Sequence, residues 1–73
     1  MSAYCVGFEH DGSSTPACLV SGADEIAAIC NAGGPTLEGT VAVVLTIPVD
    51  PQKPAAARYR CKKGQWVLES RSP

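Results

Sequence analysis

The residue types that serve nucleophilic catalysis lie close together near the N-terminus. His10 and Asp11 are adjacent, and Ser13 and Ser14 follow within a turn-forming segment, Asp11–Pro16. A catalytic triad is defined by geometry, because its serine, histidine and carboxylate side chains must be joined by hydrogen bonds. Neighbouring residues of an extended chain point to opposite sides, so His10 and Asp11 are not expected to meet. We therefore predict a solvated histidine at a strand end, and no enzymatic activity.

The four cysteines are the second group of reactive residues. No two are separated by the two residues that are typical of zinc knuckles and redox motifs. A zinc site built from distant elements is an alternative, with donors drawn from Cys5, His10, Cys18, Cys30 and Cys61. For an oxidising compartment we favour two disulfides, Cys18–Cys30 and Cys5–Cys61. In a reducing compartment the same residues are expected to be buried free thiols that pack as small hydrophobic side chains. No metal and no cofactor are predicted.

Charge is divided along the chain, although the net charge is only −1. All six Lys and Arg lie after residue 52, and all seven Asp and Glu except Glu69 lie before residue 51. Charge and an aromatic side chain coincide in the C-terminal segment, which makes it the candidate partner-binding site. The candidate residues are Arg58, Arg60, Lys62, Lys63 and Trp66. The alternative is an edge hairpin that Lys and Arg protect from aggregation.

Length and composition limit the class of protein. A chain of 73 residues forms one domain, expected to span 1–73 with a frayed polar tail at 70–73. Hydrophobic residues at 45% and charged residues at 18% exclude a disordered composition, and no apolar run is long enough to span a membrane. The N-terminus lacks the features of a signal peptide. We expect a cytoplasmic protein if Met1 is native, and a secreted or periplasmic one if a leader has been removed.

The clearest helical signal lies between Ser21 and Ala32, and predicts one short helix over about residues 22–32. Ser21 and Asp24 fit a capping pattern at its start. Ile26, Ile29 and Cys30 are spaced to form one apolar face. Gly33–Gly34–Pro35 is expected to end the helix, because glycine accepts a left-handed cap and proline cannot continue.

Alternating apolar residues predict strands over Tyr4–His10 and Thr40–Ile47, with a hairpin formed by Arg58–Cys61 and Gln65–Glu69. Its turn is Lys62–Lys63–Gly64. Ala17–Val20 is either a brief strand or the approach to the helix, and Pro48–Pro54 is a proline-rich loop. These elements predict an α+β fold in which the helix packs on one face of a small antiparallel sheet of three to five strands. We expect Ala42, Val44 and Val67 on the other face, where a partner or a second copy would cover them.

The stretch Tyr59–Val67 resembles the C-x-x-G-x-W hairpin near the ends of some bacterial surface and pilus-tip modules. In those hairpins the cysteine is usually disulfide-bonded and the tryptophan packs over the hairpin. The resemblance covers about nine residues, and we take neither a family nor a function from it.

The small core and the lack of paired catalytic groups favour a non-enzymatic interaction protein. It would offer a rigid sheet or hairpin surface to another protein, or to a second copy of itself. One alternative is a secreted, disulfide-stapled inhibitor or adhesion module. Another is a weak nucleic-acid binder that uses the basic hairpin, although the net charge makes nucleic acid the less favoured partner.

Overall fold

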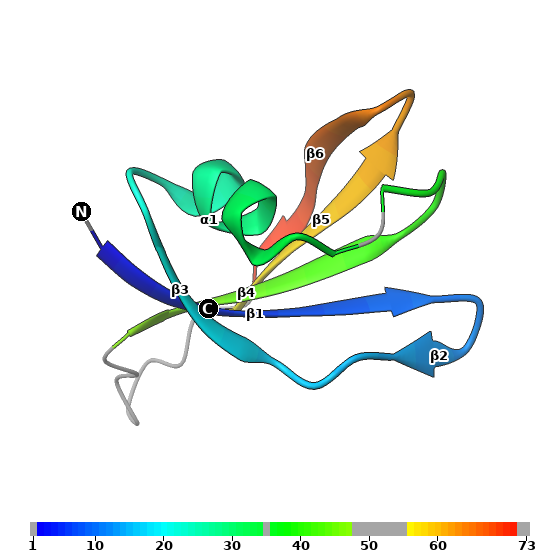
Figure 1. The fold of residues 1–73 in the computed structure, drawn as a ribbon. Helices are drawn as coiled ribbons and strands as arrows, with labels where there is room; N and C mark the ends of the chain where they lie inside the picture. The colour runs from blue at the N-terminus through cyan, green and yellow to red at the C-terminus, as the bar shows by residue number, and fades with distance from the viewer. Residues whose placement is uncertain (1, 35, 48–55, 72–73) are drawn as a thin grey trace.

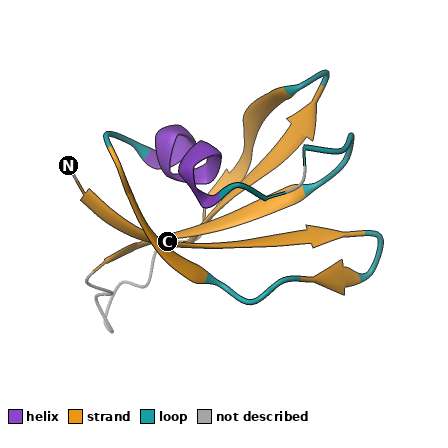
Figure 2. Cartoon of the chain, in the orientation of Figure 1, coloured by secondary structure: helices purple, strands orange, loops and turns teal. Residues whose placement is uncertain are grey.

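One helix lies on a curved antiparallel sheet in the computed structural model, which describes residues 2–34, 36–47 and 56–71 (Figures 1 and 2). The elements in chain order are β1 (Ser2–His10), β2 (Ser13–Ser14), β3 (Cys18–Gly22), α1 (Glu25–Ala32), β4 (Val41–Ile47), β5 (Ala56–Lys62) and β6 (Gln65–Arg71). The strand order is β2-β1-β4-β5-β6, and β3 pairs with β1 on the same edge as β2. The predicted α+β class is confirmed. The sheet has six strands but is only five strands wide, because β2 and β3 share one edge.

The core lies between α1 and the sheet face that it covers. Tyr4, Val6 and Phe8 of β1 point to this face, as their alternation predicts, and the burial pattern along β1 follows the same period of two. The neighbouring strands and the helix complete the core with Ala28, Ile29, Ala42, Val44, Ala57 and Tyr59. All the strand residues in this set are register partners or diagonal neighbours, so one continuous apolar surface supports the helix.

The sheet curves around the helix. Trp66 on β6 reaches Phe8 on β1, with ring centroids 6.0 Å apart, although β4 and β5 lie between these strands in the sheet order. Figure 1 shows the β5–β6 hairpin rising beside α1. We call the face that holds α1 the concave face and the opposite one the convex face.

The helix is shorter than the sequence predicts. Its N-cap is Asp24, whose Oδ1 accepts a 2.8 Å hydrogen bond from the Ala27 amide, so Ser21 is not the cap and the helix begins at Glu25. Ser21 belongs to β3, and the next residue, Gly22, packs so closely on α1 that a Cβ atom there would lie 2.7 Å from the Ala28 nitrogen. Gly33 ends the helix in a left-handed conformation, with φ of 69°, as predicted.

The apolar face predicted for the helix is only partly correct. Ile29 is buried, but Ile26 and Cys30 are exposed, and Ala28 takes their place in the core. Small residues are favoured at this position because the helix lies close to β3, where the Gly22 backbone faces Ala28. No described helix is long and apolar enough to cross a membrane.

The two faces of β4 are exchanged relative to the prediction. Ala42 and Val44 lie under the helix and are fully buried, whereas Val43, Leu45 and Ile47 lie on the convex face. The small Ala42 side chain leaves room on the concave face for Phe8 and Tyr59, which flank it in register. Alternation shows which residues share a face, but not which face the helix covers.

The C-terminal hairpin forms as predicted, with a two-residue loop. Lys63 and Gly64 both have positive φ, 53° and 76°, which is the signature of a type I′ turn between β5 and β6. Ser70 and Arg71, expected to belong to a frayed tail, are instead the last residues of β6, and Arg71 pairs with Glu25 of α1. The predicted loop Pro48–Pro54 and residues 72–73 lie outside the described residues.

Candidate protein-binding surface

The convex face of the sheet is not covered by any described element, and its two halves differ in character. In the half formed by β5 and β6, arginine side chains lie over the strands. Arg58 donates to Glu9 across β4 at 2.8 Å, and Arg60 forms a two-pronged pair with Glu69. Val41 lies beneath them in register with Arg60, and it is only 6% exposed although it faces away from the helix. These side chains therefore act as a cover for this half.

The Arg60–Glu69 pair is held by its own hydrogen bonds. The bonds that Arg60 donates lower the pKa of the Glu69 carboxyl, and the same bonds raise the pKa of Arg60. Arg60 also donates to the Gly39 carbonyl at 3.3 Å. Both side chains are more than one-third exposed, so the pair holds the two side chains in place on the convex face and adds little to the stability of the fold.

The other half of the convex face is apolar and hollowed. A groove of about 250 Å³ lies there, with Cys5, Val43 and Leu45 among its lining residues. Gly7, the register partner of Val43, contributes no side chain to the groove. The Thr15–Ala17 segment borders the groove: a Cβ atom on Gly7 would lie 3.4 Å from the Thr15 carbonyl oxygen. We call this feature the convex groove.

Leu19 of β3 lies beside the convex groove. It is the register partner of Cys5, which places it on the convex face, and it is 69% exposed, the highest value among the exposed large hydrophobic residues of the described chain. Nothing in the sequence marks Leu19, because its orientation depends on the register between β1 and β3. An isolated exposed leucine is ordinary, but one beside an apolar hollow is typical of a binding surface.

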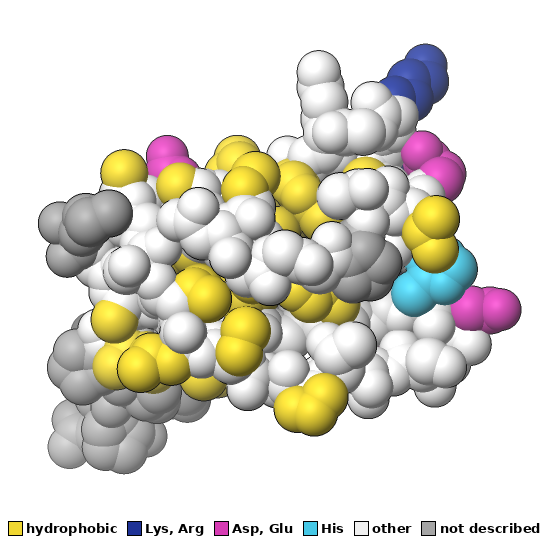
Figure 3. All heavy atoms as spheres, in the orientation of Figure 1, with side chains coloured by type: hydrophobic (Ala, Val, Ile, Leu, Met, Phe, Trp, Pro, Cys, Tyr) yellow, Lys and Arg dark blue, Asp and Glu magenta, His cyan; other side chains and the backbone are white. Residues whose placement is uncertain are grey.

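The five residues predicted to bind a partner do not form one surface. Arg58 and Arg60 lie on the convex face in their ion pairs, whereas Trp66 lies on the concave face, half-buried against Phe8. Lys62 and Lys63 stand at the tip of the hairpin, where Figure 3 shows basic side chains beside acidic ones. The Lys63 amide donates to Glu38 at 2.8 Å. The role of these five residues in partner binding stays a prediction.

A second polar cluster joins the helix to the hairpin. Glu25, the first residue of α1, accepts a 2.6 Å hydrogen bond from the Tyr59 hydroxyl and two bonds from Arg71, at 2.7 and 2.9 Å. The Arg71 bonds are the largest cause that lowers the pKa of Glu25, and burial is the largest cause that raises the pKa of Tyr59. A shallow hollow beside the cluster is lined by Tyr4, Thr46 and the first turn of α1. These three side chains bond to one another and link α1 to the hairpin, which is typical of a structural contact.

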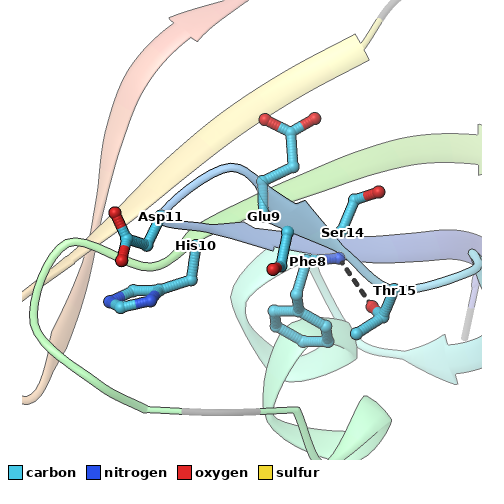
Figure 4. Close-up of a pocket in the computed structure, with 7 residues that line it drawn as sticks. Phe8, Glu9, His10, Asp11, Ser14 and Thr15 are labelled. Carbon is cyan, nitrogen blue, oxygen red and sulfur yellow. Dashed lines mark hydrogen bonds between the residues drawn. The ribbon is translucent and has the colours of Figure 1, made fainter.

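The triad-type residues near the N-terminus line one hollow without being joined (Figure 4). His10, Asp11 and Ser14 all border it, yet no hydrogen bond or ion pair links their side chains in the described structure. The bond drawn there runs from the Phe8 amide to the Thr15 hydroxyl, at 3.1 Å, and it holds the hairpin together. The arrangement lacks the contact between base and nucleophile that acyl transfer requires.

All four cysteines are free thiols. The expected Cys5–Cys61 disulfide is not formed, because Cys5 lies on the convex face and Cys61 is buried on the concave face. Cys18 and Cys30 are exposed and are not joined either. Among the described residues, no three His, Cys, Asp or Glu side chains gather where a metal ion would bind.

Comparisons with protein families, with curated proteins and with solved structures found no match to this chain. The geometry of the surface therefore carries the functional argument alone.

Proposed function

We propose that this chain is a small non-enzymatic interaction module that binds a partner protein through the convex groove. The observation that carries the proposal is the position of Leu19 beside the groove, since Leu19 is the most exposed large hydrophobic residue among the described residues and pairs in register with Cys5, which lines the groove. A partner would insert an apolar side chain between Leu19 and Val43. Such a contact buries apolar area in a preformed hollow, which is the usual centre of a binding surface.

The charges beside the groove indicate the chemistry of the partner surface. Glu9 borders the groove, and Arg58 already neutralises it at 2.8 Å. The rim is therefore polar but has no net charge to attract an acidic or basic partner. We infer that the partner presents an uncharged apolar segment, with polar groups around it that contact Ser14 and Thr15.

The basic hairpin gives less support to the nucleic-acid alternative. All three of its arginines, Arg58, Arg60 and Arg71, are paired with a glutamate. A phosphate backbone would have to break these pairs, so little free positive charge is left to attract it in the described part of the chain.

The test compares capture of proteins from an extract of the source cells by three immobilised forms of the chain. These are the natural chain, Leu19→Asp at the groove and Lys62→Asp at the hairpin tip. Both substitutions place one carboxylate on an exposed strand residue, and Lys62→Asp also removes a positive charge, so this control is the larger change of charge. Circular dichroism of each form verifies that the fold is kept.

We expect the natural chain and Lys62→Asp to retain the same protein, and Leu19→Asp to retain at least about tenfold less of it. If Leu19→Asp captures as much of the protein as the natural chain does, the groove is not the binding site. Capture that is lost with Lys62→Asp would instead assign binding to the basic hairpin.

A further inference from the structure

The outer edge of β6 is open. No described strand pairs with it, and β6 forms one border of the sheet (Figure 1). Val67 on the convex face and Leu68 on the concave face are 42% and 47% exposed. The segment Gln65–Leu68 carries no charge, whereas edge strands are commonly protected by charged residues or proline. An edge of this kind is a template for another strand.

The turn geometry shows which backbone groups of β6 point outward. In a hairpin with a two-residue type I′ loop, the residues flanking the loop, here Lys62 and Gln65, exchange hydrogen bonds, and bonded pairs then alternate along the ladder. Val67 therefore bonds inward to Arg60. The N–H and C=O groups of Trp66 and Leu68 point away from β5 and are available to a further strand.

The opposite border of the sheet is blocked in three ways. β2 has only two residues, and Pro16 lies between β2 and β3. Near the end of β3, the Asn31 side chain of α1 donates to the Ser21 carbonyl at 2.8 Å. Short strands, proline and a covering helix all prevent pairing at an edge. Because β6 is the less protected border of the sheet among the described residues, a second copy can add its own β6 there, and the assembly closes as a dimer.

We propose that two copies of this chain pair through β6, antiparallel and centred on Val67. In this register Trp66 of one copy faces Leu68 of the other, so all the outward groups of these two residues bond across the two-fold axis. The two Val67 side chains meet on the convex face, and the Trp66–Leu68 pairs meet on the concave face. Glu69 lies toward the uncharged Gln65 of the second copy.

The irregularity in β6 limits how far the pairing extends. Tyr59 pairs with Leu68 and Arg58 with Ser70, which leaves Glu69 as the extra residue of a bulge. The regular segment therefore ends at Leu68. Three paired residues from each copy bury less area than a standard interface of about 1,600 Å², so we expect a weak dimer that forms at high protein concentration. The convex groove lies over β1 and β4, away from the β6 edge, and stays open in this dimer.

Sedimentation of the full chain over about 10 µM to 1 mM tests the proposal. We expect the average mass to rise with concentration from 7.5 kDa toward twice that value. Val67→Lys and Val67→Glu should each remain monomeric, because like charges would face each other across the two-fold axis. A mixture of the two variants should dimerise again, which shows that both are folded. Leu19→Asp, which alters only the groove, should dimerise as the natural chain does.

Amide hydrogen exchange gives a second readout. The Trp66 and Leu68 amides should exchange more slowly as the concentration rises, while the inward Val67 amide should change less. A chain that stays at 7.5 kDa up to about 1 mM overturns the proposal. Association that survives Val67→Lys, or that is lost with Leu19→Asp, overturns it as well. None of these results depends on whether the convex groove captures a partner.

Discussion

Thr40 is fully buried, and its hydroxyl has no hydrogen-bond partner among the described residues. Its backbone is well bonded, because its amide donates to Leu37 at 3.0 Å and its carbonyl accepts from Cys61 at 2.8 Å. Thr40→Val keeps the shape and removes the unpaired hydroxyl, so it should raise the free energy of unfolding by about 1 kcal/mol. Urea denaturation at constant m-value measures the change.

Thr40→Ala is the matched control for this prediction. It removes the hydroxyl and also a methyl group, and the cavity it leaves should make it about 1 kcal/mol less stable than Thr40→Val. If Thr40→Val is itself less stable than the natural chain, the hydroxyl is hydrogen-bonded, for example to an ordered water molecule.

At the scale of elements, one carboxylate links α1 to both strands of the C-terminal hairpin. Glu25 accepts from Tyr59 on β5 and Arg71 on β6, and its pKa lies below the usual value of 4.5, chiefly through the Arg71 bonds. A lowered pKa in the folded state stabilises the fold above pH 4.5, and this contribution is lost as the pH falls through the lowered value. Stability should therefore decline with acid.

Glu25→Gln tests this link. It should lower the free energy of unfolding at neutral pH by on the order of 1 kcal/mol, since Arg71 is largely solvated, and flatten the decline below pH 4.5. Asp11→Asn, in the exposed turn after β1, is the control and should keep the decline of the natural chain. Parallel pH curves for the natural chain and Glu25→Gln would show that Glu25 does not act as the link. Thermal unfolding followed by circular dichroism between about pH 3 and 7 supplies these curves.

Local patterns predicted the elements well because their causes are local. The alternation in β1 and β4, the glycine that ends α1 and the turn at Gly64 all depend on residues a few positions apart. The start of α1 was misplaced because Ser21 and Asp24 are both good caps, and tertiary contact decided between them. Once Ser21 is paired with Ala3 in the sheet, the helix can begin only after it.

The candidate site was much harder to predict, because it depends on which residues of neighbouring strands face each other. The convex groove exists because Gly7 faces Val43 and because the chain between β2 and β3 leaves the ladder at Thr15–Ala17. The alternation of apolar residues does not contain this information. The ion pairs were missed for the same reason, since Arg58 and Glu9 are 49 residues apart in the sequence.

Over the whole molecule, acidic residues from the first part of the chain and basic residues from the last part neutralise each other in ion pairs. Glu9 and Glu25 from the acidic half of the sequence pair with Arg58 and Arg71 from the basic half. The antiparallel order, which brings β5 and β6 back beside β4 and α1, makes these contacts possible. The arginines that first indicated a basic binding surface are thus paired with glutamates of the same chain. The apolar convex groove is therefore the better candidate for a binding surface.

The burial of the four thiols gives a test of the whole fold. Cys18 and Cys30 are exposed, Cys5 is partly buried, and Cys61 is 1% exposed between Thr40 and Trp66. A thiol reagent should therefore modify Cys18 and Cys30 rapidly and Cys5 more slowly. It should modify Cys61 only when the sheet opens. For a domain stable by about 5 kcal/mol, opening slows the last step by about a thousandfold or more.

The Cys61→Ala variant should lack the slow phase, which would assign that phase to Cys61. The natural chain, unfolded without a reductant, should react at all four thiols. Fewer than four thiols would show that a disulfide forms and would favour the stapled, secreted alternative. Rapid modification of Cys61 would show that the hairpin does not pack on the core as described. A slow phase that shortens with urea in step with global unfolding would instead show that β4, β5 and β6 open together, as one cooperative unit.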